Sequence, residues 1–228
     1  MSRAAGISQN VRMIDGWRQA LTLAAQTDDF LVMSKVGRVF TVPEIIAKEI
    51  ARFPDIDAEL YLGWRKDLEE AFRHINFQAT FNDFSRRLSK SLLINIQFCA
   101  HELNKRLPEK EISPEELVKL REAVTTLYDE VLKSDLPPDL FRYALDHLFL
   151  IIEALDNYSI TGATGIEMAL NAVVGTVVTQ NNLSKKFADS AVGAKFWQTM
   201  GRIAVALSLG KFGYELADSA LKALGYSP

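Results

Sequence analysis

Histidine and cysteine are the side chains whose chemistry would most readily support catalysis or metal binding, and they are few in this chain. The 228 residues contain three histidines, His74, His101 and His147, and one cysteine, Cys99. No two histidines have the spacing of metal ligands on one helix, and neither an HExxH nor a CxxC pattern occurs in the sequence. We therefore expect no catalytic residue, no metal ligand, no cofactor-binding residue and no cofactor.

Two of the histidines have an acidic neighbour. Glu70 lies four residues before His74 on a predicted helix, and Asp146 directly precedes His147 in an apolar stretch. We interpret the first pair as an exposed helical pair and His147 as a hydrogen-bonded core histidine. Cys99 lies among apolar residues, so we expect a small buried side chain and no disulfide.

The sequence also lacks a convincing phosphate-binding motif. The glycine turn at residues 162–165 has neither the Walker spacing nor a preceding strand. Arg86, Arg87 and Lys90 form the best basic cluster, but a solvated helix face explains it, and the formal net charge of the chain is -3. Nucleic acid is therefore not an expected partner.

The composition is that of a folded chain, with 48% apolar and 24% charged residues, enough to form one large domain or two small ones. A single cysteine suits a reducing compartment. Residues 1–10 lack the apolar run of a secretory signal, and no run of about 18 apolar residues occurs. We expect a cytoplasmic protein.

Helical spacing of apolar residues recurs along the chain, and strand patterns are almost absent. We predict an all-α fold, an irregular bundle of about seven to nine helices without a sheet. Three segments are expected: an N-terminal helical segment at 1–56, a central helical bundle at 57–160, and a Gly/Ala-rich C-terminal helical segment at 161–228 that packs on the bundle.

Capping patterns predict where several helices begin. Thr41 with Glu44 three residues later forms a capping box, and Asn82 is expected to cap a long helix that ends near Leu107. Ser113, followed by a proline and by Glu116, is the strongest start signal in the chain. Apolar spacing adds a helix over residues 8–26, one continuous stripe over 60–75 and a strongly apolar helix after Pro137 and Pro138.

Two features of the sequence favour docking between helices. One predicted helix carries apolar residues at strict three-four spacing, which is typical of a seam against a partner helix. The C-terminal segment holds eight of the twelve glycines. Because an interior glycine costs a helix about 1 kcal/mol relative to alanine, these glycines indicate either close helix crossing or a segment that can rearrange. The candidate interaction residues are Leu117, Leu120, Val124, Leu127, Val131, Gly201, Gly210, Gly213 and Tyr214.

A membrane role is possible only conditionally. The apolar stretches at 166–178 and 203–210 form the most apolar part of the chain, but polar residues crowd the first, and Arg202 and Lys211 bracket the core of the second. Neither approaches the roughly 20 residues that span a bilayer.

Residues 136–175 carry a pair of prolines, an apolar helix that ends in Ala-Leu-Asp-Asn-Tyr, and then Gly162 before a second apolar helix. This arrangement resembles helical proteins of bacteria, some of which accompany phage-defence or toxin loci. The resemblance covers about a sixth of the chain and implies an accessory role in such systems.

The function expected from the sequence is that of a non-enzymatic helical protein–protein interaction module, an accessory or regulatory subunit of a bacterial defence or stress system. Its expected partner is another protein or a second copy of itself. Two alternatives remain open: a membrane-perturbing effector that acts through the C-terminal segment, and an enzyme with an unrecognised helical active site.

Overall fold

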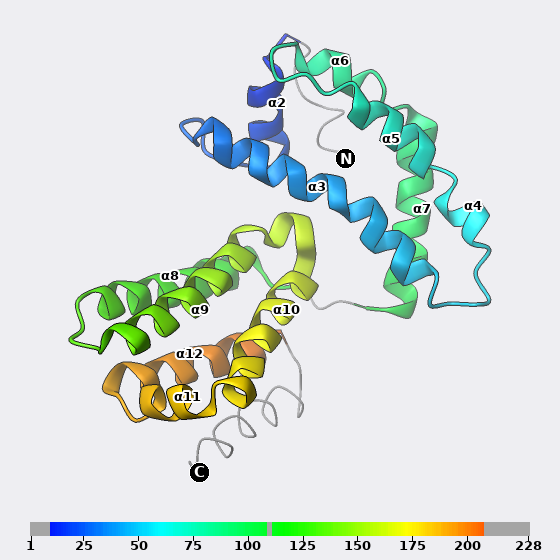
Figure 1. Cartoon of the computed structure of the whole chain (residues 1–228). Coiled ribbons are helices and arrows are strands. Elements are labelled where there is room, and N and C mark those ends of the chain that lie inside the picture. Colours follow the sequence, from blue (N-terminus) through cyan, green and yellow to red (C-terminus); the bar gives the residue numbers. More distant parts are fainter. Residues whose placement is uncertain (1–9, 109–110, 208–228) are drawn as a thin grey trace. The chain divides into compact units, whose positions relative to one another are not determined.

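The computed structural model describes residues 10–108 and 111–207, and these residues form an all-α protein (Figure 1). Nine of the helices have seven or more residues, and no strand occurs in the described ranges. The predicted fold class, an all-α multi-helix bundle without a sheet, is confirmed.

The chain divides into two compact units, Met1–Pro108 and Glu109–Pro228. Each unit has its own hydrophobic core, and the two cores share no residue. These boundaries do not coincide with the expected segments 1–56, 57–160 and 161–228. The reason lies in packing, because side chains on both sides of residue 56 share one core and side chains on both sides of residue 160 share the other.

The first unit is built around aromatic side chains. Trp17 packs against Phe84 with ring centroids 5.0 Å apart, and its ring meets Phe81 edge to face at 5.9 Å. All three side chains are buried. The helices of this unit are α2 (Met13–Ala20), α3 (Asp29–Ile50), α4 (Ala58–Leu62), α5 (Arg65–Arg73), α6 (Phe81–Ser85) and α7 (Lys90–Arg106).

An arginine fixes the loop after α3 to the end of α7. The Arg106 guanidinium donates two hydrogen bonds to Asp55, at 3.0 and 2.8 Å, and a third to Glu102 at 2.8 Å. It also lies over the Phe53 ring, 5.2 Å from the centroid. The guanidinium lowers the pKa of both carboxyl groups through these hydrogen bonds.

Helix α3 begins at Asp29, twelve residues before Thr41 of the predicted capping box, so that prediction was wrong. Asp28 caps the helix, since its carboxylate accepts from the backbone N–H groups of Phe30 and Leu31 at 2.9 and 3.4 Å. Thr41 lies inside the helix and donates to the carbonyl of Arg38, and Pro43 is also internal. The apolar residues that follow Asp28 supply the packing that carries the helix past this proline.

The other helix predictions for the first unit were right in type but wrong in extent. The expected helix over 8–26 ends at Ala20, just before Thr22, whose φ is 58°. The stripe over 60–75 divides into α4 and α5 at Gly63. Asn82 caps no long helix; it lies within the short α6, and Ser89 caps α7 by accepting from the backbone N–H of Leu92 at 3.1 Å.

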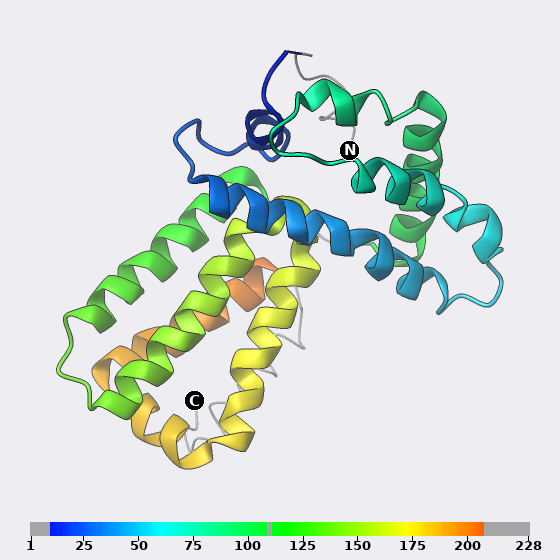
Figure 2. The same cartoon turned by 45° about the horizontal axis from the view of Figure 1, so that its top comes forward.

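The second unit is a bundle in which α8 packs against α9 and α12, and α9 packs against α10 (Figure 2). Its helices are α8 (Pro114–Leu132), α9 (Pro138–Asp156), α10 (Tyr158–Thr179), α11 (Asn181–Ala188) and α12 (Ala191–Ala206). The predicted start at Ser113 is confirmed, because its hydroxyl accepts from the backbone N–H of Glu116 at 3.2 Å. Gly162, with φ 63° and ψ -161°, bends α10 just after its first turn (Figure 1).

Candidate interaction surfaces and a buried polar cluster

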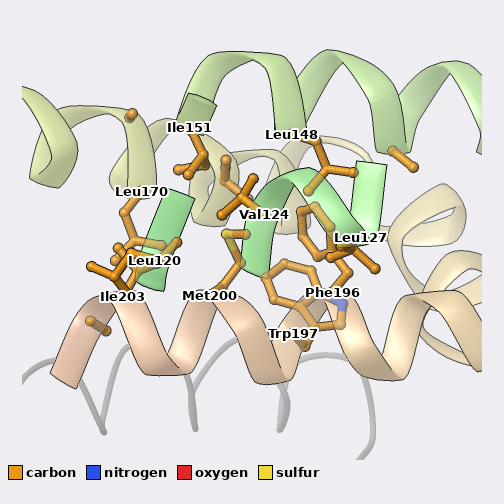
Figure 3. Close-up of a cluster of buried hydrophobic side chains, with 14 of the residues drawn as sticks. Leu120, Val124, Leu127, Leu148, Ile151, Leu170, Phe196, Trp197, Met200 and Ile203 are labelled. Atoms are coloured by element: carbon orange, nitrogen blue, oxygen red, sulfur yellow. The ribbon is translucent and has the colours of Figure 1, made fainter. Parts of the chain in front are cut away.

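The predicted seam on α8 lies in the core of the second unit. Leu120, Val124, Leu127 and Val131 are buried, and Leu117 is partly buried against the same cluster. Figure 3 shows α8 side chains meeting Leu148 and other residues of α9 and α12. The seam therefore holds the unit together and is not free to bind another molecule.

The glycine part of the predicted interaction surface falls in two places. Gly201 lies on α12, where an added Cβ would meet nothing within 4 Å, so no close helix crossing requires a glycine there. Gly193, on the same helix, lies close to the backbone of α11, because an added Cβ there would be 1.8 Å from the Phe187 carbonyl oxygen. The sequence pattern did not indicate this position. Gly210, Gly213 and Tyr214 lie outside the described residues.

The potentially reactive side chains do not form a metal centre. Within residues 10–108 and 111–207, no group of three or more His, Cys, Asp or Glu side chains is arranged to bind a metal ion. His74 is exposed, with Nδ1 3.5 Å from Glu70. Cys99 is buried, and burial raises the pKa of its thiol. In the basic cluster, Arg86 pairs with Asp83 at 3.0 Å.

His147 belongs to a buried polar cluster that joins α9, α10 and α11. Its Nδ1 donates to the Tyr143 carbonyl at 2.6 Å, and its Nε2 lies 2.9 Å from the Thr176 hydroxyl, which itself donates to the Val173 carbonyl at 2.6 Å. The Tyr143 hydroxyl lies 3.2 Å from the Thr176 hydroxyl and 3.0 Å from that of Ser184. Burial lowers the pKa of His147, so its neutral form is favoured in the folded protein.

The chemistry available to this cluster is limited by its geometry. Ser184 has no exposed surface, so its hydroxyl cannot reach a substrate from solvent. The histidine bonds to Thr176 and not to Ser184, and its second nitrogen is held by a backbone carbonyl in place of a carboxylate. The cluster therefore acts as a set of hydrogen bonds that fixes the register of three helices.

Helix α3 exposes several large apolar side chains in the first unit. Phe30 is 82% exposed, Leu31 is 50% exposed and Met33 is 37% exposed. Further along the same helix, Ile45 is 49% exposed. The exposed positions Phe30, Met33, Ser34, Gly37, Thr41 and Ile45, which together we call the α3 face, share one side of the helix by their spacing.

No exposed charged side chain interrupts the α3 face between Phe30 and Thr41. Lys35 is buried, and Arg38, which is partly buried, lies at the flank by its position on the helical wheel. A Cβ added at Gly37 would contact nothing, so the centre of the face is open to the close approach of another backbone. An exposed side of a helix that carries apolar side chains and no charge is a candidate interaction site.

Helix α10 has an apolar surface of a different kind. The stretch Tyr158–Val177 is long and apolar enough to cross a membrane by length and composition, and only 33% of its most apolar window is buried. One such helix is weak evidence for a span, because the core helices of soluble proteins have the same properties. Met168, at 69% exposed, is its most exposed large apolar side chain.

The α3 face was missed because the predicted helix began too late. Asp28 followed by Phe30, Leu31, Val32 and Met33 contained the signal, a capping carboxylate before an apolar run.

No known family model, no curated protein and no solved structure matches this chain.

Proposed function

We propose that the chain is a non-enzymatic helical interaction protein that pairs with a second copy of itself through the α3 face. The observation that carries the proposal is the exposed, uncharged side of α3 from Phe30 to Thr41, with Ile45 and the charged Glu44, which pairs with Arg65, beyond it. Burying a side chain such as Phe30, Met33 or Ile45 contributes about 1.5–3 kcal/mol to the free energy of association.

A second copy suits this face because the face is complementary to itself. In an antiparallel pair with its two-fold axis near Val39, Met33 of each copy lies opposite Ile45 of the other, and Gly37 lies opposite Thr41.

The test is the mass of the full chain in solution, measured by sedimentation and light scattering over a range of concentrations. The proposal predicts a dimer of twice 25.5 kDa that dissociates on dilution, since one helix from each copy forms a small interface. Met33→Glu combined with Ile45→Glu should yield a monomer, because two carboxylates would meet apolar side chains.

The matched control is Leu60→Glu, which places the same charge at a highly exposed apolar residue of the same unit outside the α3 face. This variant should keep the dimer. A wild-type chain that stays monomeric at about 100 μM, far above the concentrations at which specific pairs form, would refute the proposal. A dimer unaffected by the Met33 and Ile45 changes would refute it as well.

The accessory role in a bacterial defence or stress system, which the resemblance of residues 136–175 implies, is the cellular setting that we propose for this assembly. The support for the setting is the resemblance alone.

A further inference from the structure

A buried arginine of α2 holds the segment that leads into α3. The Arg18 side chain is only 9% exposed, and its guanidinium pairs with the carboxylates of Asp15 and Asp29. Its Nε donates to the backbone carbonyl of Thr27 at 3.0 Å. Asp15 lies on α2, Thr27 precedes α3, and Asp29 is the first residue of α3. One side chain therefore ties the start of α3 to α2, which lies beside it (Figure 1).

The beginning of α3 has little buried surface of its own. From Asp29 to Ser34, Val32 is the one buried residue. The Asp28 carboxylate caps the helix by accepting from N–H groups of the same segment, so the cap favours helix formation without attaching the segment to α2. Burial of Val32 and the ion pair between Arg18 and Asp29 join this stretch to the rest of the first unit.

The stretch that Arg18 holds carries one end of the α3 face. Phe30 and Met33 belong to that face, and Phe30 is its most exposed large side chain. A helix end frays readily where few buried contacts hold it. Ordering a frayed end at the moment of binding weakens association, whereas a turn that is already ordered binds without that loss.

An arginine is suited to this position because its donors point in several fixed directions. Each of the three guanidinium nitrogens of Arg18 contacts a different group. A lysine has a single nitrogen and could not hold the three groups in the same geometry.

We propose that Arg18 is a positioning residue of the α3 face, which orders the first turns of α3 so that Phe30 and Met33 are presented to the second copy. The role rests on the pairing of two copies proposed above. Because Arg18 is buried, it acts through Asp29 and Thr27 and not by contact with the second copy.

Hydrogen exchange tests the ordering without pairing, in full chains diluted until sedimentation shows monomers. Arg18→Gln should raise the exchange rate of amides 30–34 about tenfold, the change expected from loss of a hydrogen bond to a charged group. Amides 46–50, at the far end of α3, should exchange as in wild type. The matched control is Arg12→Gln, which removes the exposed guanidinium that pairs with the same Asp15 carboxylate at 2.7 Å. This control should leave amides 30–34 unchanged.

The dimer dissociation constant, measured by sedimentation, tests the effect on pairing. Arg18→Gln should raise it about tenfold and Arg12→Gln should leave it unchanged. Asp29→Asn is a milder variant at a carboxylate that is 54% exposed, and it should raise both the dissociation constant and the exchange rate of amides 30–34. Combined with Arg18→Gln, it should raise the dissociation constant no further, because both changes break the same contact.

Equal exchange of amides 30–34 in Arg18→Gln and Arg12→Gln would overturn the proposal, and so would a dissociation constant that Arg18→Gln leaves unchanged. Additive effects of Arg18→Gln and Asp29→Asn would show that Arg18 does not act through Asp29, which contradicts it as well. If Arg18→Gln does not fold, unchanged exchange and pairing in Asp29→Asn are the refuting result. A monomeric wild-type chain would refute the pairing itself, and the exchange rates, which need no dimer, distinguish that failure from a failure of Arg18 to order α3.

Discussion

Gly193 and Gly201 lie two turns apart on α12 and should respond in opposite ways to the same substitution. An alanine Cβ at Gly193 would lie 1.8 Å from the Phe187 carbonyl oxygen and 2.6 Å from its carbon, distances that force the start of α12 away from α11. Such overpacking costs about 1–3 kcal/mol. It also disturbs the cap in which the Ser190 hydroxyl accepts from the Gly193 N–H at 2.9 Å, a contact worth about 1 kcal/mol.

Gly193→Ala should therefore lower the unfolding free energy of the second unit by about 1–3 kcal/mol, after allowance for the gain in helix propensity of at most about 1 kcal/mol. Gly201→Ala meets no neighbour and should raise that free energy by about 0.5–1 kcal/mol. This expectation for Gly201 replaces the one drawn from the sequence, that a glycine there favours close helix crossing.

Urea unfolding followed by the fluorescence of Trp197 measures both effects. Trp197 is buried in the second unit, and a background of Trp17→Phe and Trp64→Phe leaves it as the one indole of the chain. Both glycine variants share this background, so differences between them belong to α12. Equal unfolding free energies for the two variants would refute the close approach of α11 and α12.

The remaining predictions concern the start of α3 and the buried histidine. Because Asp28 caps α3, Asp28→Ala should lower the unfolding free energy of the first unit by about 1 kcal/mol, whereas Thr41→Ala should leave it unchanged. Urea unfolding measures both values, and equal losses of unfolding free energy would contradict the assigned start of α3. The pKa of His147 is lowered in the folded protein, so the unfolded chain binds its proton first as the pH falls below about 7. The unfolding free energy should therefore decrease between about pH 7 and pH 5, by about 1.4 kcal/mol for each unit by which the pKa of His147 differs between the unfolded and folded chain. His147→Gln should make the unfolding free energy less dependent on pH over this range. An unchanged pH dependence would exclude His147 as its source.

Periodicity and capping predicted the helical class and several helix starts, because these depend on neighbours in the sequence. Ser113 illustrates this success, since its hydroxyl and the proline after it act within one turn. Thr41 illustrates the limit. Its spacing to Glu44 satisfies the capping pattern, but tertiary packing of Val32 and Val36 continues the helix through it.

The candidate site was harder to predict than the fold. The seam from Leu120 to Val131 has the same pattern whether its partner is α9 or another molecule, and only the structure shows that it is buried internally. Gly193 was overlooked because the need for a glycine arises from the backbone of Phe187, which the α12 sequence does not reveal. The hydrogen bonds of Thr176 and Ser184 to Tyr143 likewise depend on helices meeting in three dimensions.

The separation of the two hydrophobic cores has a consequence for how the sequence can change over generations. Substitutions that repack the aromatic cluster around Trp17 need compensation only from residues of the first unit, because none of those side chains belongs to the other core. The same holds for Phe196 and its neighbours in the second unit. Each half of the protein can therefore diverge at its own rate, and recombination near residue 108 would exchange one half while leaving the interior of the other intact.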